Sequence, residues 1–199
     1  MAGTDALRTR LFEIAEAQAG YFTAAQAREA GYSYAAQNHH HKAGNWLREG
    51  WGIYRLRDFP YTPAEELVRL MLWSRDRQGE MQATVSHESA LEAYGLSDVL
   101  PAAIHLTAPK GFRKRPPKGV VLHCAHLASN EVRERDGYRV TTPLRTLLDV
   151  AASNLSPEHL QAAIHEAVQQ GLVRASELER ALAEAPVDVQ SRFEAAGLP

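Results

Sequence analysis

The sequence contains a single cysteine, no long apolar run and no excess of positive charge. One cysteine, Cys124, excludes a disulfide within the chain. No apolar run approaches the length of about 20 residues that a membrane-spanning helix needs, so we expect no contact with a membrane. The first twenty residues carry acidic side chains and lack an unbroken apolar core. We therefore expect no secretion signal and a cytoplasmic location.

The charge balance limits the ways in which the chain can bind nucleic acid. The formal net charge is -2 and the isoelectric point is about 6.5. Histone-like coating of nucleic acid is therefore not expected, and any binding must depend on local basic patches and weaken strongly with salt. With 199 residues, of which 45% are hydrophobic and 23% charged, the composition is that of an ordinary globular chain of one or two domains.

Common catalytic signatures are also missing. The sequence has no GxxxxGK[ST] phosphate-binding loop, no GxSxG nucleophile turn and no HExxH zinc motif. A metal-dependent nuclease core would need an acidic residue or glutamine two positions before a lysine. None of the lysines, Lys42, Lys110, Lys114 and Lys118, has one there. We therefore expect no enzymatic activity, no catalytic residues and no cofactor.

Two groups of histidines look like metal ligands but fail on expected geometry. In a strand, alternation sends His123 to one face and Cys124 with His126 to the other, so at most two ligands would meet. The histidines of the run 39–41 would point about 100 degrees apart on a helix and could not converge on one ion. We expect surface and packing roles for both groups and predict no metal site.

The segment from Gly20 to Leu56 carries the strongest local signals, and it reads GYFTAAQAREAGYSYAAQNHHHKAGNWLREGWGIYRL. A helix is predicted just before it, over residues 5–18, because apolar residues recur there at helical spacing. Thr23 and Gln26 form a capping box that starts a second helix. After a tight turn, Ser33 caps a third helix. The segment therefore begins as two short helices joined by a turn.

A basic hairpin is predicted after the third helix. Strands at Trp46 to Arg48 and at Gly52 to Arg57 are joined through a glycine-rich turn at residues 49–51. From Ser33 to Arg57 there are four lysines or arginines against one acidic residue, so this piece is locally basic. Helices and hairpin in this order are typical of a winged helix-turn-helix. We predict such a DNA-binding domain over residues 1–60.

At about 100 degrees per residue, the third helix has two different sides. Ala35, Ala36, His39, His40 and Ala43 fall on the side that we expect to be buried. The other side carries groups that can read base edges or hold phosphates. A small helix-turn-helix can instead bind protein or be purely structural, but a polar helix beside a basic hairpin favours DNA. The predicted DNA-binding residues are Tyr34, Gln37, Asn38, His41 and Lys42 in the helix, and Arg48, Arg55 and Arg57 in the hairpin.

The remainder of the chain is predicted to be a second domain. The segment 58–61 interrupts the preceding pattern, and we place the domain boundary after residue 60. Helices and strand-like runs then mix over residues 61–185, and residues 186–199 show no strong periodicity and are expected to be a loosely held tail. The whole chain is thus expected to be α+β. The expected strands are 103–107, 120–126 and 137–141, and the expected helices begin near residues 62, 86, 142, 156 and 176.

Several segments together resemble a known family. They are GYFTAAQAREAGYS with GNWLREGWGIYRL, then ATVSHESALEAYGL, AAIHLTAP and DGYRVTTPLRTLLDVA. In this order they are similar to the AbiEi family of bacterial antitoxins and predicted regulators of phage-defence systems. The resemblance extends from about Leu7 to Leu182, and TTPLRTLLD is its most specific motif. The third helix departs from the family pattern, because it has three successive histidines and no large aliphatic residue.

The resemblance implies both a function and partners. An N-terminal winged helix-turn-helix would repress the chain's own operon, with the DNA-binding role falling on the helix and hairpin residues given above. A C-terminal domain of mixed α/β structure would be a type IV antitoxin, which opposes a nucleotidyltransferase-like toxin without needing direct contact with it. The DNA partner is then double-stranded DNA of the chain's own promoter and its repeats.

Two alternatives stay open at this stage. Helix-turn-helix proteins usually read two half-sites as homodimers, but binding as a monomer on repeats fits equally well. The chain could also be a protein-interaction module that does not bind DNA and neutralises its toxin by direct contact. The excess of seven acidic residues over three arginines from Glu158 onward would suit a basic partner surface.

Two further features belong to the second domain. The run 110–118 carries five positive charges and no acid between two predicted strands, so we expect a protruding loop. It is either a phosphate-binding loop or a solvated charge run. Arg145 and Asp149 are four residues apart on a predicted helix, and we expect their pairing to brace the helix rather than to aim Arg145 at a partner. The candidate phosphate-binding residues are Lys110, Arg113, Lys114, Arg115 and Lys118.

Overall fold

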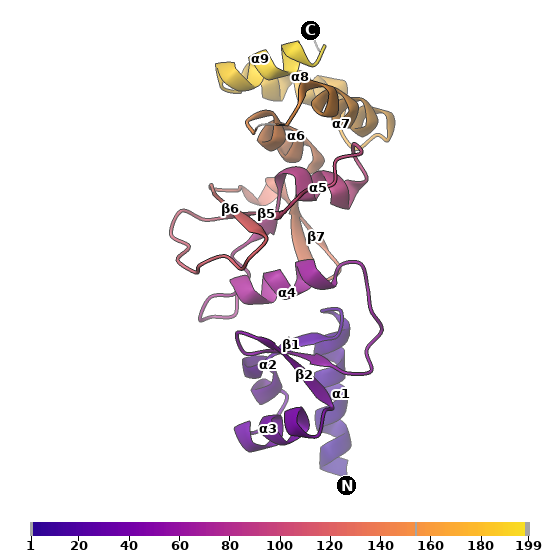
Figure 1. Ribbon diagram of the computed structural model, residues 1–199, viewed down its shortest axis with the longest axis vertical. Helices are drawn as coiled ribbons and strands as arrows, with labels where there is room; N and C mark the ends of the chain where they lie inside the picture. The colour runs from indigo at the N-terminus through magenta and orange to yellow at the C-terminus, as the bar shows by residue number, and fades with distance from the viewer. Residues whose placement is uncertain (1, 154, 198–199) are drawn as a thin grey trace. The chain divides into compact units, whose positions relative to one another are not determined.

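The computed structural model describes residues 2–153 and 155–197, and within this part the chain is built from helices and two sheets (Figure 1). The protein is therefore α+β, as predicted. Its contacts divide it into two compact units, Met1–Ala83 with Glu134–Tyr138, and Thr84–Arg133 with Arg139–Pro199. Met1, Asn154 and the last two positions of the predicted tail, Leu198 and Pro199, lie outside the described residues.

The first unit has a three-stranded antiparallel sheet in the order β1-β3-β2. Its core contains Leu11 and Ala15 from the first helix together with Phe22, Tyr32 and Trp46. These side chains join the helices to one face of the sheet. The elements are α1 (Ala2–Glu16), β1 (Tyr21–Thr23), α2 (Ala24–Glu29), α3 (Tyr34–Lys42), β2 (Trp46–Gly50), β3 (Ile53–Leu56) and α4 (Glu65–Ser74).

The predicted caps form the turn between α2 and α3. The Thr23 hydroxyl accepts a hydrogen bond from the Gln26 backbone N–H at 3.1 Å, and Gln26 Oε1 accepts one from the Thr23 N–H at 2.9 Å. The Ser33 hydroxyl accepts from the Ala36 N–H at 3.2 Å. Gly31 has a φ of +106°, a conformation that side chains rarely adopt. The capping signals in the sequence therefore located this turn correctly.

The predicted hairpin is present as β2 and β3. Trp46 lies opposite Leu56, and Arg48 lies opposite Tyr54. Because successive side chains in a strand point to opposite faces, these four residues share the face that carries the core. Arg55, one position from Tyr54, points to the other face.

Helix α4 groups with the first unit. Arg55 is 1% exposed, and its Nη2 lies 2.9 Å from Glu65 Oε1 at the start of α4. Leu70 and Met71 of the same helix are fully buried. The two compact units therefore divide after Ala83, whereas the sequence analysis places a domain boundary after residue 60, where the helical pattern is interrupted.

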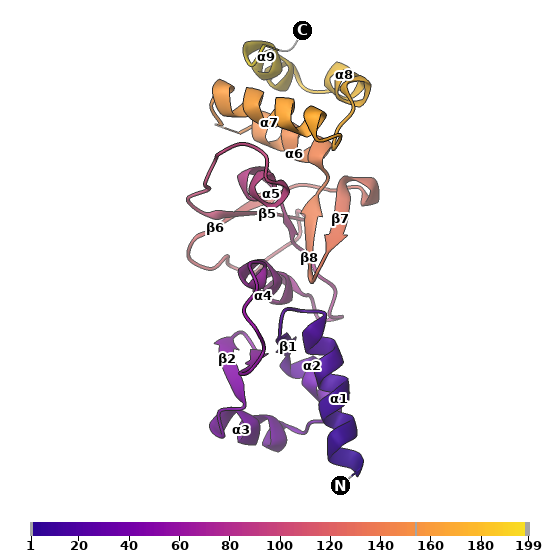
Figure 2. The ribbon, with the colours of Figure 1, turned by 90° about the vertical axis from the view of Figure 1, so that its right-hand side faces the viewer.

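The second unit contains most of a five-stranded sheet in the order β6-β5-β4-β8-β7. Figure 2 labels β5, β6, β7 and β8 of this sheet. Strand β5 runs parallel to β6 and antiparallel to β4, and β4 runs parallel to β8. The strands are β4 (Thr84–Val85), β5 (Ile104–Ala108), β6 (Val120–Cys124), β7 (Val132–Arg135) and β8 (Tyr138–Thr141), and the helices are α5 (His87–Tyr94), α6 (Pro143–Ala151), α7 (Pro157–Gln169), α8 (Ala175–Ala183) and α9 (Val187–Ala195), with a 3-10 turn at Ser129–Glu131.

Helices α5 to α8 of the second unit begin close to the positions that the sequence predicts. Gly95 ends α5 in the left-handed conformation, and Thr142 and Ser156 cap α6 and α7 through their hydroxyls. Within the described residues, no helix combines the length and the apolar character that a bilayer-spanning segment requires.

The stretch expected to be a tail contains a helix. Residues 187–195 form α9, in which Val189 is 4% and Phe193 1% exposed. Two buried residues four positions apart make a weak periodic signal, which explains why the sequence alone did not indicate a helix there.

A charged network braces the N-terminal half of α6. Arg145 Nε donates to Asp149 Oδ1 at 2.8 Å, which confirms the expected pairing, and Arg145 Nη1 donates to Glu131 Oε1 at 2.8 Å. Glu131 Oε2 also accepts from the Ala128 N–H at 2.8 Å. Burial acts to raise the pKa of Glu131, but the Ala128 N–H and the Arg145 guanidinium outweigh it and hold that pKa below its ordinary value. Arg145 thus ties α6 to the segment before β7.

We expect the replacement Glu131→Gln to make the second unit less stable by about 1–2 kcal/mol at neutral pH, because the negative charge that strengthens the hydrogen bonds from Arg145 and the Ala128 N–H is lost. The folded-state pKa is depressed, so the contribution of this carboxylate is full above its ordinary value of 4.5 and is lost as the pH falls through the folded value. Urea unfolding followed by far-UV circular dichroism should therefore show a difference from the unsubstituted protein that disappears in acid.

Glu92→Gln serves as the matched control, because Glu92 is exposed on α5 and its replacement should change stability by less than about 0.5 kcal/mol. A difference for Glu131→Gln that stayed constant from neutral to acid pH would contradict the electrostatic explanation.

Candidate nucleic-acid interface and histidine cluster

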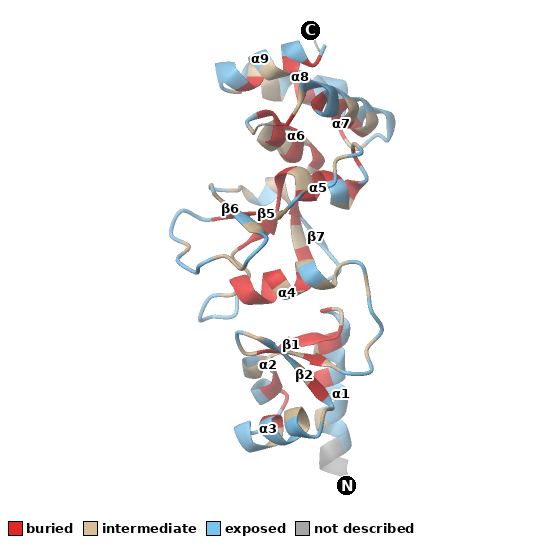
Figure 3. Cartoon of the chain, in the orientation of Figure 1, coloured by how far each residue is buried: buried red, intermediate tan, exposed pale blue. Residues whose placement is uncertain are grey.

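The outer side of α3 is polar and open to solvent (Figure 3). Tyr34 is 67% exposed, and its hydroxyl accepts a hydrogen bond from Arg28 Nη1 at 3.1 Å. Asn38, His39 and Lys42 are also exposed. These positions recur with the spacing of one helical face. The face therefore presents phenol, amide, imidazole and ammonium groups together.

The inner side of α3 differs from the one expected. Gln37 is 2% exposed, and its Nε2 donates to the carbonyl oxygens of Ala24 at 3.2 Å and Tyr32 at 3.1 Å. The His40 ring stacks on Trp46, with ring centroids 4.8 Å apart. His40 thus lies inward as expected, whereas Gln37 was expected outside. The helix is rotated because one amide satisfies two backbone carbonyls near the turn, which an alanine could not do.

His39 and His41 also lie differently from the expected arrangement. His39 is exposed on the helix, although the sequence analysis placed it on the buried side. His41 is half-buried, and its Nδ1 lies 3.3 Å from the carbonyl oxygen of Trp46. His41 is therefore partly occupied with holding α3 to the hairpin.

The hairpin arginines separate into two environments. Arg48 is exposed and lies opposite Tyr54, whose ring centroid is 6.2 Å from that of His41 in α3. Arg48 therefore projects from the face of the sheet that carries α3. Arg57 is also exposed and donates through Nε to the carbonyl oxygen of Gly44.

Arg55 was expected on the DNA-binding surface, but the structure places it inside the first unit. Strand alternation turns its side chain away from the α3 side of the sheet. There it pairs with Glu65 and donates to the carbonyl oxygen of Phe59 at 2.8 Å. A guanidinium held in this way is not available to phosphate.

The basic run lies in the loop between β5 and β6. All five of its cations, Lys110, Arg113, Lys114, Arg115 and Lys118, are exposed. The loop thus leaves the sheet as predicted. Its exposure is compatible both with phosphate binding and with a solvated charge run.

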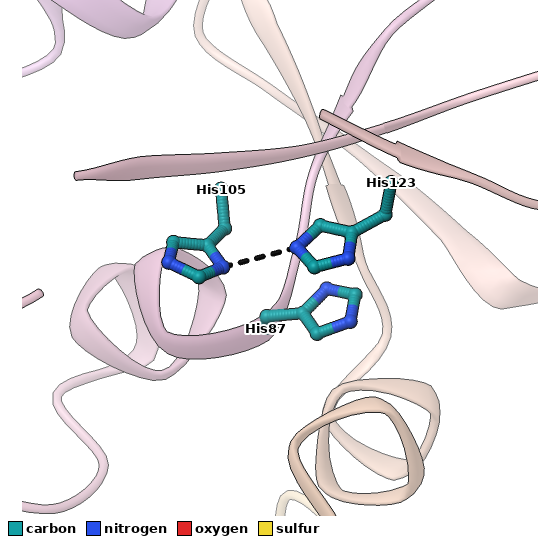
Figure 4. Close-up of side chains that lie close together, drawn as sticks. All are labelled: His87, His105 and His123. Atoms are coloured by element: carbon teal, nitrogen blue, oxygen red, sulfur yellow. Dashed lines mark hydrogen bonds between the residues drawn. The ribbon is translucent and has the colours of Figure 1, made fainter. Parts of the chain in front are cut away.

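A cluster of three histidines lies elsewhere, in the second unit (Figure 4). His87 begins α5, His105 belongs to β5 and His123 to β6. One ring nitrogen from each lies within 4.8 Å of the others. His105 Nδ1 is 3.1 Å from His123 Nε2, and the His87 ring stacks on His123 with centroids 3.6 Å apart. The three residues are called the histidine cluster below.

Burial disfavours the charged form of two of the three rings, His87 and His123. Desolvation is the largest cause, followed by the neighbouring His123 and His105, and together they lower the pKa of His87 to about 3. Burial and His105 also lower the pKa of His123. Neutral imidazoles present a lone pair on one nitrogen and a proton on the other.

The sequence patterns did not predict this cluster, although strand alternation correctly separated His123 from Cys124. Cys124 is exposed and His123 points inward, as strand alternation predicts. Thr107 pairs with His123 in the parallel ladder, so His105, two positions earlier, lies on the same face as His123. The cluster depends on which strands pair, so it could not be predicted from the sequence alone.

The comparisons with known proteins identify the class. A family model described as the AbiEi antitoxin C-terminal domain matches residues 83–195. The protein is therefore an antitoxin, the component of a toxin–antitoxin system that acts against a toxin. Because the match spans more than half of the chain, the protein belongs to the AbiEi antitoxin family.

A solved structure shares the fold. The crystal structure of the RV2827C protein from Mycobacterium tuberculosis is similar with a TM-score of 0.59 and 18% sequence identity, over 97% of this chain and 78% of that chain. At this identity the likeness concerns the fold alone. Comparison with curated proteins finds no match.

The neighbouring residues Gln37 and Asn38 should differ sharply in their effect on stability. Gln37→Ala removes the amide that donates to the backbone carbonyls of Ala24 and Tyr32 and should lower the unfolding free energy by about 1–3 kcal/mol. Asn38→Ala, at an exposed position, should change it by less than about 0.5 kcal/mol. Urea unfolding followed by tryptophan fluorescence measures this, because Trp46, Trp51 and Trp73 all belong to the first unit. A larger loss of stability for Asn38→Ala than for Gln37→Ala would contradict the orientation of α3 in the structure and support the orientation expected from the sequence.

Proposed function

We propose that residues 1–60 form a winged helix-turn-helix that binds the chain's own promoter and represses its operon, and that residues 61–185 carry the antitoxin function. The antitoxin opposes a nucleotidyltransferase-like toxin, and neither part acts as an enzyme. The observation that carries the DNA-binding proposal is the polar, solvent-exposed side of α3 beside the basic hairpin.

The order of elements supports this proposal. Helices α2 and α3 are joined by a tight capped turn, and the β2–β3 hairpin follows directly. In helix-turn-helix proteins the second helix of the pair enters the major groove, and a following hairpin can contact the backbone. Helix α3 corresponds to the former and the hairpin to the latter.

The exposed residues have complementary chemistry for duplex DNA. Asn38 carries an amide that can form a bidentate pair with adenine, and Tyr34 and His39 add donors and acceptors along the same face. Lys42 and Arg48 carry charges suited to phosphate. Gln37 and Arg55 are left out of the proposed interface because both are buried. The proposed interface is Tyr34, Asn38, His39, Lys42, Arg48 and Arg57, with His41 at its edge.

The unaltered protein should bind its own upstream DNA much more tightly than scrambled DNA of equal length. The triple variant Asn38→Ala, Lys42→Ala, Arg48→Ala should lose at least about 100-fold in affinity, since one base contact is worth roughly 1–3 kcal/mol. Lys42→Ala alone should reduce the slope of log affinity against log salt by about 1. Fluorescence anisotropy across a salt series measures both quantities.

A matched control removes the same number of positive charges at a distance in sequence. Arg174→Ala with Arg180→Ala takes two exposed cations from the region of α8 and should leave DNA binding unchanged. Weak binding of the unaltered protein, equal on both DNAs, would overturn the DNA-binding proposal.

The second candidate function is direct neutralisation of the toxin by contact. It is favoured by the seven acidic residues against three arginines from Glu158 onward, which would suit a basic partner. The type IV proposal and this candidate differ in one respect. Only direct neutralisation requires a stable complex.

Coexpression with the nucleotidyltransferase-like toxin separates the functions. Both the unaltered protein and the triple DNA-binding variant should restore growth, because the antitoxin function is assigned to residues 61–185. Size-exclusion chromatography of the mixed proteins should show no stable complex. Loss of protection by the folded triple variant would place antitoxicity in the DNA-binding surface, and a co-eluting complex would favour direct neutralisation.

A further inference from the structure

We propose that the histidine cluster of His87, His105 and His123 binds a divalent transition-metal ion of the Zn²⁺ class, with the carboxylate of Glu88 as the fourth ligand. The proposal concerns the second unit alone. It does not depend on DNA binding by the first unit.

The spacing of the ring nitrogens suits such an ion. Zn–N bonds of about 2.0–2.1 Å in a tetrahedral site place ligand nitrogens about 3.3 Å apart. His105 Nδ1 and His123 Nε2 are 3.1 Å apart, and all three ligand nitrogens lie within 4.8 Å of one another. The three imidazoles come from three different elements (Figure 4). The His87 ring, which now stacks on His123, would have to turn for the third nitrogen to reach bonding distance.

Glu88 supplies the observation that most favours a cation. Its Oε2 is buried and has no hydrogen-bond partner in the described part of the chain. This oxygen lies 3.0 Å from His105 Nδ1, the same nitrogen that approaches His123. When His105 Nδ1 carries no proton, this buried carboxylate oxygen has no donor, which is costly. A divalent ion at this point would compensate the carboxylate and accept the lone pairs of the imidazoles.

The surroundings orient the rings. The Ser86 hydroxyl lies 2.9 Å from His87 Nδ1 and accepts a hydrogen bond from the Thr107 hydroxyl at 2.8 Å. Hydroxyls and carboxylates around metal-binding histidines commonly fix ring orientation in this way. His87 itself has a φ of +52°, a conformation that is uncommon for a residue other than glycine. The backbone is thus held where it brings the imidazole to the other two.

An ion at this place would connect the start of α5 to β5 and β6. Binding to the folded state but not to the unfolded state stabilises the folded state. The metal would therefore lock together the part of the sheet on which α5 packs. Imidazole and carboxylate ligands favour Zn²⁺ over Mg²⁺ or Ca²⁺, which prefer oxygen ligands alone.

The test begins with the full chain, freed of metal with a chelator and carrying no affinity tag. Titration with Co²⁺ should produce visible absorption bands of tetrahedral intensity that saturate at one ion per chain, and added Zn²⁺ should abolish them. Isothermal titration with Zn²⁺ should give the same stoichiometry, and Zn²⁺ but not Mg²⁺ should raise the melting temperature.

Variants then assign the ligands. His105→Gln and His123→Gln should each weaken Zn²⁺ binding by at least about 100-fold, and Ser86→Ala by about 10–100-fold, as typical for residues that orient metal ligands. Cys124→Ser, His159→Gln and His39→Gln, at exposed positions, should keep the site and exclude binding elsewhere. Circular dichroism of each variant checks that the second unit is folded.

The unaltered protein decides the question even if a variant fails to fold. Absence of the Co²⁺ bands and of Zn²⁺ binding in the metal-free full chain would overturn the proposal and leave a stacked, hydrogen-bonded group of imidazoles. Binding that survives in both folded His105→Gln and His123→Gln would overturn it as well, because the ion would then be held elsewhere.

Discussion

The packing around Trp46 is the constraint on which the orientation of α3 depends. Its indole stacks on His40, and its ring lies edge-on to Phe22 and Tyr32. The Trp46 carbonyl also lies 3.3 Å from His41 Nδ1. Aromatic pairs of this kind add roughly 0.5–1.5 kcal/mol each beyond the area that they bury. Because one residue of β2 contacts two neighbouring residues of α3, the helix can neither rotate nor slide along the hairpin without losing several contacts at once.

Local signals in the sequence predicted the elements well, but the rotation of α3 could not be read from them. Thr23, Ser33 and Gly31 act through their nearest neighbours, so their roles are visible in the sequence. The inward side of α3 is chosen by partners distant in sequence, and Gln37 and His40 occupy it through an amide donor and a flat ring. A rule that buries alanine and exposes polar groups fails here because the polar groups are satisfied inside.

The same distinction explains Arg55 and the histidine cluster. Strand alternation was sufficient to separate His123 from Cys124, whereas separating Arg55 from Arg48 also requires the hairpin register, in which Arg48 lies opposite Tyr54. The partner of Arg55, Glu65, lies beyond an irregular connection, and the partners of His123 lie on β5 and α5. Pairings of this kind depend on sheet order, and sheet order is not a local property. The sequence therefore indicated which side chains could bind or react, and the fold determined which of them lie close together.

Charge connects these observations to the proposed function. The chain has a net charge of -2, and one of the hairpin cations, Arg55, is neutralised by Glu65 inside the first unit. The proposed interface is thus left with Lys42, Arg48 and Arg57 as its full charges, so few condensed counterions would be released on binding. Nonspecific affinity would then be weak, and discrimination between sequences would rest on base contacts from α3. For a repressor of its own operon this balance is favourable, because a protein with little affinity for random DNA is not titrated away from its operator.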